Sequence, residues 1–166
     1  MTTNQSASKP FKANEGDFGL TKIDQLIINK QEGFYGVTKP VTVRIPDTDA
    51  ATAANYTTPF FIADRTYEIL SAVERHEVAG SDGSAVTLQV EKVPSGTAPG
   101  SGTVVLASTF NLKGTANTNQ EAVVLQTYSG SVPVRRLSRG DALALKTSGT
   151  LTAVDGVCVS VLLRSI

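Results

Sequence analysis

The sequence predicts an all-β fold, an antiparallel β-sandwich or jelly roll that follows an extended N-terminal arm. Threonine (20 residues) and valine (18 residues) lead the composition of the 166-residue chain, and both are β-branched residues that suit strands. From Val41 onward, short apolar runs recur about every 8–15 residues, separated by turns rich in glycine, proline, asparagine and serine. No stretch shows the period of an amphipathic helix.

The composition changes at about residue 40. Every basic residue of 1–40 is a lysine, whereas all seven arginines lie from Arg44 onward. Residues 1–22 lack the apolar density that offsets ordering entropy, and residues 23–29 (IDQLIIN) form the one compact apolar stretch of this part. We therefore expect an extended arm with one adhesive segment over residues 1–40 and a β-sandwich domain over residues 41–166. A frayed terminus without a role is the alternative for the arm.

The first half of the domain is predicted to hold four strands. Residues 41–45 alternate and stop at Pro46, and residues 60–62 follow a polar loop over 47–59. Residues 67–78 form a long run whose second half turns polar, so we expect it to bend at a bulge or to project beyond the core. After a turn over 81–84, residues 85–93 alternate with Val86, Leu88 and Val90 on the buried face and Thr87, Gln89 and Glu91 on the other.

The second half is predicted to hold shorter strands. Residues 94–102 contain three glycines and two prolines, which predicts a surface loop. Strands are expected over 103–112, 122–125 and 132–137, and Pro133 confines the last of these to an edge or a strand start. A turn over 139–141 precedes strands over 142–145 and 157–163. The final strand is expected to bury Val157, Val159, Val161 and Leu163. The sequence thus predicts eight or nine strands in all.

The composition also excludes several classes of function. The formal net charge is zero, which argues against a general nucleic-acid binder. No apolar run reaches the roughly 18–20 residues of a membrane span, and the N-terminus has no apolar core of a signal peptide. One cysteine excludes an intramolecular disulfide and a cysteine-rich zinc site, and one histidine removes most histidine-based metal sites. We therefore expect no enzyme, no cofactor, and no catalytic, cofactor-binding or metal-ligating residue.

Single residues with reactive chemistry are each given a structural interpretation. Cys158 lies between Val157 and Val159, so we interpret it as a buried, inert thiol rather than a nucleophile. His76 is interpreted as part of the solvated end of a strand. Asp47 and Asp49 offer oxygen ligands for calcium, but they lack the glycine and the distal glutamate of an EF-hand loop and are interpreted as loop residues.

Charged groups leave further alternatives. No spacing singles out a pair for glycoside hydrolysis among the available glutamates, Glu68, Glu74, Glu77 and Glu91. Arg139-Gly140-Asp141 matches an adhesion tripeptide but is interpreted as a turn. A basic cluster (Arg135, Arg136 and Arg139) contrasts with residues 64–91, where six acidic residues outnumber three basic ones. The two segments form either a mixed solvated surface or a contact between neighbouring subunits, in which arginine forks bind carboxylates.

Five segments of strand and turn sequence carry a resemblance to a known family. They are VTLQVEK (86–92), PSGTAPGSGTVVL (94–106), NLKGTANT (111–118), LSRGDALAL (137–145) and GTLT (149–152). Together they resemble small virion proteins of tailed bacteriophages, in particular head decoration (capsid cement) proteins of jelly-roll type, over roughly the last half of the chain.

The resemblance implies a structural virion protein. It would be made in the cytoplasm of the host bacterium, form a homotrimer and bind the major capsid protein on the outer capsid surface of a phage head, with the arm gripping the shell. Neither nucleic acid nor a membrane is an implied partner. The alternative is a carbohydrate- or receptor-binding β-sandwich module of a phage tail or adhesin. The sequence offers few aromatic platforms for sugar stacking, since it has no tryptophan and four tyrosines, Tyr35, Tyr56, Tyr67 and Tyr128. A small hydrolase that uses carboxylates is a third and weaker hypothesis.

Overall fold

The computed structural model describes residues 36–46 and 56–166. These residues contain twelve strands and no helix. The prediction of an all-β chain is confirmed for these residues. The strands are β1 (Thr38–Arg44), β2 (Thr57–Ile62), β3 (Tyr67–Arg75), β4 (Thr87–Val93), β5 (Thr103–Val104), β6 (Phe110–Asn111), β7 (Gln120–Ala122), β8 (Tyr128–Ser129), β9 (Val132–Pro133), β10 (Arg136–Leu137), β11 (Ala142–Ser148) and β12 (Cys158–Ser165). Residues 1–35, which hold most of the predicted arm, lie outside the described residues, so the arm stays a prediction.

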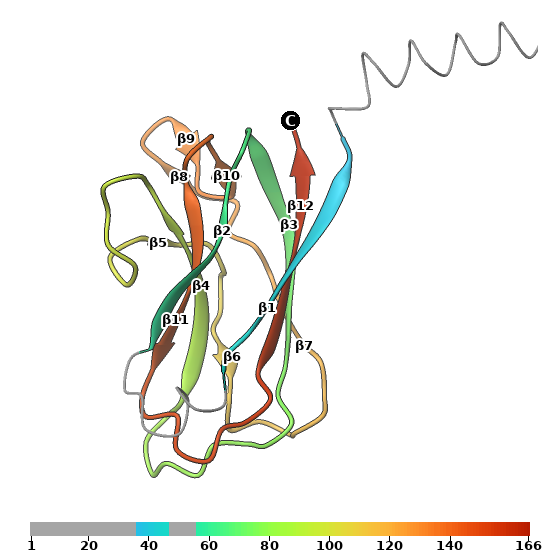
Figure 1. The fold of residues 1–166 in the computed structure, drawn as a ribbon, viewed down its shortest axis with the longest axis vertical. Helices are drawn as coiled ribbons and strands as arrows, with labels where there is room; N and C mark the ends of the chain where they lie inside the picture. The colour runs from blue at the N-terminus through green and yellow to red at the C-terminus, as the bar shows by residue number, and fades with distance from the viewer. Residues whose placement is uncertain (1–35, 47–55) are drawn as a thin grey trace, which may run out of the picture. The chain divides into compact units, whose positions relative to one another are not determined.

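Two antiparallel five-stranded sheets form the sandwich. The first sheet has the order β1-β12-β3-β10, with β7 pairing the other half of β3, and the second has the order β2-β11-β4-β5, with β6 also pairing β4. Figure 1 shows the two sheets as separate layers, with β1, β12 and β3 in one and β2, β11 and β4 in the other. Strands β8 and β9 form a small hairpin of their own.

The connectivity is that of a jelly roll. Strands β1 to β4 alternate between the two sheets, and the last two long strands insert between them: β11 lies between β2 and β4, and β12 lies between β1 and β3. Neighbours in each sheet are therefore far apart in the sequence, as in the double-sheet jelly rolls of viral capsid and lectin domains. The predicted fold class is confirmed.

The core lies between the sheets and follows the predicted alternation. The inward residues of the final strand are all buried, namely Val157, Val159, Val161 and Leu163. They face buried residues of the second sheet, including Leu88, Val90, Leu143 and Leu145, in one hydrophobic cluster. This apolar contact between the two inner faces is the main source of stability in a sandwich.

A β-bulge in β3 changes which residues face the core. Leu163 is opposite Ile69 and Leu162 is opposite Ser71, so Leu70 is an extra residue on β3. The predicted bulge is therefore present. Its consequence is a shift of the alternation by one residue, because Tyr67 and Ile69 are buried before the bulge, whereas Ala72, Glu74 and His76 are buried after it. The expected projection of the second half of this run beyond the core is wrong.

Two later predictions of strand extent are also corrected. The strand predicted over 103–112 is broken into β5 and β6, because Leu106 leaves the second sheet to bridge Val124, beside β7 of the first. The strand predicted over 132–137 is split into β9 and β10, which pair with different partners. Pro133 lies in the two-stranded hairpin, consistent with its predicted confinement to an edge.

Each sheet ends on a strand that carries a proline. In β1 the residues that hydrogen-bond to β12 alternate with residues whose backbone groups point away from it. Ile45 donates its N–H to the Val157 carbonyl, and the Val37 carbonyl accepts from Ser165, so Pro40 is one of the residues that point away. In β2, Tyr56 accepts from the N–H of Thr147 and Thr58 is opposite Leu145, so Pro59 likewise points away from β11. At both positions the backbone N–H of any other residue would point outward from the edge of the sheet, and proline has no N–H there.

Candidate functional site

A buried polar cluster lies at the C-terminal end of β3. Glu74 and His76 are both fully buried, and His76 Nδ1 lies 3.0 Å from Glu74 Oε1. The other ring nitrogen, Nε2, lies 3.2 Å from the carbonyl oxygen of Gly114. Gln120 donates to Glu74 Oε2 at 2.8 Å and links this carboxyl to β6 by bonds to the backbone of Asn111. The prediction that His76 lies at a solvated strand end is wrong, because the bulge at Leu70 turns it inward.

The hydrogen bonds of His76 hold the Glu74 carboxyl in the core. Both ring nitrogens have an oxygen partner, which is the Glu74 carboxyl for Nδ1 and the Gly114 carbonyl for Nε2. Burial raises the pKa of Glu74, and the contacts with His76 and Gln120 lower it in part. Because the cluster is closed to solvent, its role is to join three strands.

A second buried carboxylate holds a loop. Glu91 is fully buried and accepts the N–H groups of Gly100 and Gly102, the latter at 3.0 Å. A side chain at Gly102 would place its Cβ 2.5 Å from the carbonyl oxygen of Lys92, so only glycine fits there. Glu91 lies on the face of β4 opposite Val90, as the alternation predicts, since the register with β11 is unbroken there, but the loop covers it from outside and buries it. The predicted surface loop over 94–102 is present, and this carboxylate together with Lys146, which donates to the Gly100 carbonyl at 2.7 Å, fixes its end.

The four glutamates weighed for glycoside hydrolysis have separate structural partners. Glu74 and Glu91 are buried in different sheets, and Glu77 forms an exposed ion pair with Arg44 at 2.9 Å. Glu68 forms an ion pair with Arg135, whose Nε lies 3.0 Å from its carboxylate, and accepts a hydrogen bond from Arg164, at the other end of β3 from Glu74. The structure therefore does not assemble these side chains into one site.

The contact between Glu68 and Arg135 bears on the charged segments. The basic cluster (Arg135, Arg136 and Arg139) was predicted either to be solvated or to meet the acidic segment of a neighbouring subunit. Arg135 has a carboxylate partner, Glu68, within its own chain, and a pairing between subunits stays a prediction. Arg136 and Arg139 are exposed and form no ion pair among the described residues.

Cys158 lies on the outer face of the first sheet and is partly exposed. Val157 and Val159 point into the core on either side of it, so the prediction of a buried thiol is wrong: neighbours in a strand face the opposite side. The thiol lines a shallow hollow of about 230 Å³ with Val73, Arg75, Asn119 and Ser160. His76, the one histidine of the chain, points into the core and hydrogen-bonds elsewhere.

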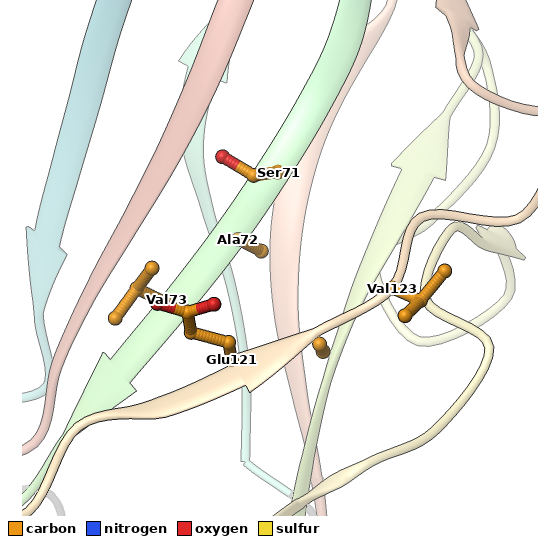
Figure 2. Close-up of a pocket in the computed structure, with 6 residues that line it drawn as sticks. Ser71, Ala72, Val73, Glu121 and Val123 are labelled. Carbon is orange, nitrogen blue, oxygen red and sulfur yellow. The ribbon is translucent and has the colours of Figure 1, made fainter.

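A second hollow lies on the same outer face. It has a volume of about 180 Å³ and lies between β3 and β7, where Ser71, Val73, Glu121 and Val123 surround it (Figure 2). Its lining mixes aliphatic groups with one hydroxyl and one exposed carboxylate. A hollow this open would leave most of a small ligand exposed to solvent.

Three more sequence predictions can be placed. Residues 139–141 form the predicted turn, since Asp141 N–H donates to the Ser138 carbonyl and the Asp141 carboxylate accepts from Ser138 N–H at 2.8 Å. Asp47 and Asp49 lie outside the described residues. Among the residues that are described, no group of three or more His, Cys, Asp or Glu side chains is placed to hold a metal ion. The same residues contain no helix with the length and apolarity needed to cross a bilayer.

Comparisons with known proteins show a shared fold. No protein-family model matches the chain, and no curated protein matches it. A chain of the cyanophage Pam1 capsid asymmetric unit matches with a TM-score of 0.52 and 16% sequence identity, over 81% of this chain and 89% of that one. A chain of infectious bursal disease virus, Gx strain, matches more weakly, with a TM-score of 0.37, 14% identity, and coverage of 78% of this chain but 32% of that one. This sandwich is therefore of a kind found in a viral capsid.

Proposed function

We propose that this chain is a structural virion protein that binds the outer surface of a phage head and stabilises it. The likeness to a chain of the cyanophage capsid asymmetric unit carries the proposal, because it extends over most of both chains. The resemblance of residues 86–152 to head decoration proteins supports the same conclusion from the sequence.

The proposed mechanism is passive. A protein that binds where several capsid subunits meet adds an interface that must be broken before the shell opens. Internal pressure from packaged DNA strains these junctions, so the added contact raises the barrier to rupture. An arm that orders on docking loses entropy but covers a large surface, and three arms in a homotrimer raise the effective concentration of each.

The proposal includes the absence of enzymatic activity. It is supported by the structural use of the groups that would otherwise be candidates for catalysis. His76 is closed to solvent with Glu74, and Glu91 anchors a loop. These carboxylates satisfy backbone and side-chain donors rather than facing an open cleft.

The alternative, a sugar-binding or receptor-binding module, receives less support. Three tyrosines are described. Tyr67 is buried and its hydroxyl donates to Asp64 at 2.5 Å, Tyr56 is half-buried against the core, and Tyr128 is exposed on the β8–β9 hairpin. One exposed ring is a small platform for a module whose affinity depends on stacking.

The test is to locate and remove the protein in the virion that encodes it. We expect immunogold labelling to decorate the head, and particles that lack the protein to release DNA at a lower temperature than complete particles. Re-adding the full chain should restore heat survival, whereas a chain without residues 1–22 should remain folded but fail to restore it. Label on the tail alone, with unchanged heat survival, would replace this proposal with the alternative.

A further inference from the structure

One end of the sandwich gathers most of its arginines. Strands β1 and β3 begin there, β2 and β12 end there, and β10 and the β8–β9 hairpin lie beside them, at the top of Figure 1. The register confirms the proximity, since Arg164 is opposite both Thr38 and Glu68, and Arg136 is also opposite Glu68. We call this surface the arginine end and define its charged members as six cationic residues and three carboxylates: Lys39, Arg65, Arg135, Arg136, Arg139 and Arg164, with Asp64, Glu68 and Asp141.

The arginine end has an excess of positive charge that the neutral composition conceals. It holds five of the seven arginines of the chain, and the other two, Arg44 and Arg75, lie at the opposite ends of β1 and β3. Each carboxylate at the arginine end already has an ion-pair or hydrogen-bond partner. Glu68 is held by Arg135 and Arg164, Asp64 by Arg65 and Tyr67, and Asp141 by its own turn. The guanidinium groups of Arg136 and Arg139 therefore face solvent without a compensating carboxylate among the described residues.

Apolar side chains are exposed on the same end. Five of the eight large hydrophobic residues that the described surface exposes belong to its elements, namely Val37, Ile62, Tyr128, Val132 and Ile166. Ile62 is 70% exposed although it lies at the end of a strand. It follows Phe61, whose ring centroid lies 5.3 Å from Lys39 Nζ. Arginine and tyrosine are enriched among the residues that contribute most to binding at protein interfaces, and the exposed aliphatic side chains add apolar area that a partner can bury.

We propose that the arginine end is the surface that docks on the shell, and that its partner is an acidic protein surface with a shallow apolar depression. This inference rests on the proposed function. Charge complementarity selects the partner, because arginine forks bind carboxylates in bidentate fashion and five of the six cations here are arginines. Ile62 and Tyr128 supply the apolar anchors.

The path of the chain supports the same orientation. Residues 1–35 join the described part at Gly36, whose N–H donates to the Ser165 carbonyl at 2.8 Å at this end. The first described residue, to which the predicted arm is joined, therefore lies at the proposed docking surface. An arm and a domain surface that engage one partner bind as linked sites, so each raises the effective concentration of the other.

The test compares charge reversals at the two ends of the sandwich. The full chain and two double variants, R136E/R139E and R44E/R75E, are mixed with shells of the same virus prepared without this protein, and binding is measured by co-sedimentation. We expect R136E/R139E to bind at least about 10-fold more weakly at about 50 mM salt, and the difference to shrink at about 500 mM. The control R44E/R75E makes the same change of charge and should bind like the wild type.

A second pair of variants tests the apolar contact. Ile62→Ser and Val123→Ser remove side chains that are both 70% exposed, on different surfaces. We expect Ile62→Ser to weaken binding at both salt concentrations and Val123→Ser to leave it unchanged, with equal melting temperatures as the check on folding.

The outcomes separate this inference from the proposed function. If the wild type binds shells and the two charge variants bind equally well, the docking surface lies elsewhere and the inference is wrong, whereas the decoration function stands. If the wild type ignores shells and instead binds duplex DNA or vesicles of anionic lipid through the same arginines, both the inference and the proposed function are wrong.

Discussion

Asp82 is a residue whose charge state should matter for stability. Its Oδ1 accepts from Ser84 N–H at 3.1 Å and its Oδ2 accepts from Thr150 N–H at 3.3 Å, so it joins two turns at one end of the sandwich. The Ser84 N–H is the main reason why the pKa of Asp82 lies below its usual value of 3.8. A carboxyl whose pKa falls on folding stabilises the protein above its unfolded pKa, and this contribution is lost as the pH falls through the folded pKa.

We therefore expect Asp82→Asn to melt below the wild type at neutral pH, and the gap in melting temperature to close as the pH falls below about 3.8. Thermal melting across this range measures it. Glu121→Gln is the control, since Glu121 is exposed and accepts no side-chain hydrogen bond among the described residues. A gap for Asp82→Asn that is constant with pH would show that its carboxylate charge is not involved.

Cys158 should tolerate a polar replacement. Its side chain is partly exposed on the outer face of the first sheet, so a serine hydroxyl there reaches water. We expect Cys158→Ser to lower the free energy of unfolding by less than about 1 kcal/mol. The neighbouring Val159→Ser buries a hydroxyl in the core, where Val159 is 0% exposed, and should cost about 2–3 kcal/mol. Equal costs in urea unfolding would mean that the two faces of β12 are not distinguished as the structure has them.

The same residues show how far sequence patterns reach. The valines of β12 could be predicted because a regular strand keeps its alternation along its length. Glu74, His76 and Glu91 could not. The partners that permit their burial are distant in sequence, such as Gln120 for Glu74 and the N–H groups of Gly100 and Gly102 for Glu91. A polar residue that such partners satisfy in the core looks, in the sequence alone, like a surface residue.

Strand β3 shows the corresponding effect for an element. The bulge was predictable from the change in composition along residues 67–78, but not its position, which depends on the register with β12. The inward set changes phase at Leu70, so Glu74 and His76 face the core.

This geometry predicts opposite effects for two deletions in one strand. Removing Leu70 takes out the extra residue, so Ile69 and Ala72 remain inward and the protein should still fold, with a modest loss of stability. Removing Val73 turns Glu74 and His76 outward and moves Arg75 toward the core, so the protein should not fold. Circular dichroism and soluble yield measure both variants. A folded Val73 deletion with an unfolded Leu70 deletion would contradict the register.

For the molecule as a whole, the sequence predicted the sandwich but not the uneven distribution of charge between its two ends. Net charge is a sum over the chain, whereas the arginine end arises because antiparallel strands bring Arg65, Arg139 and Arg164 to one end from separate parts of the sequence.

The proposed homotrimer is a prediction at this scale. Three arms on one particle are needed for the multivalent grip that the proposed function uses. Sedimentation equilibrium of the isolated protein should give three times the chain mass of 17.4 kDa. The variant R44E/R75E serves as the control for changes of charge away from the arginine end. A stable monomer at micromolar concentration, on and off the shell, would contradict the trimer.

The prolines at the outer edges of β1 and β2 have a consequence for crowding. A shell holds its decorating proteins at high local density, where an open strand edge would template sheet growth from one copy to the next. Pro40 and Pro59 each remove an outward N–H and interrupt the ladder that such growth needs. We expect P40T/P59T to remain folded but to form large β-rich aggregates on concentration, detected by light scattering, whereas Pro94→Thr in the exposed loop should not. If all three proteins stay equally dispersed, the prolines have no protective role. If P40T/P59T alone aggregates, the absence of these two N–H groups is what limits the growth of a sheet from one copy of the chain to the next.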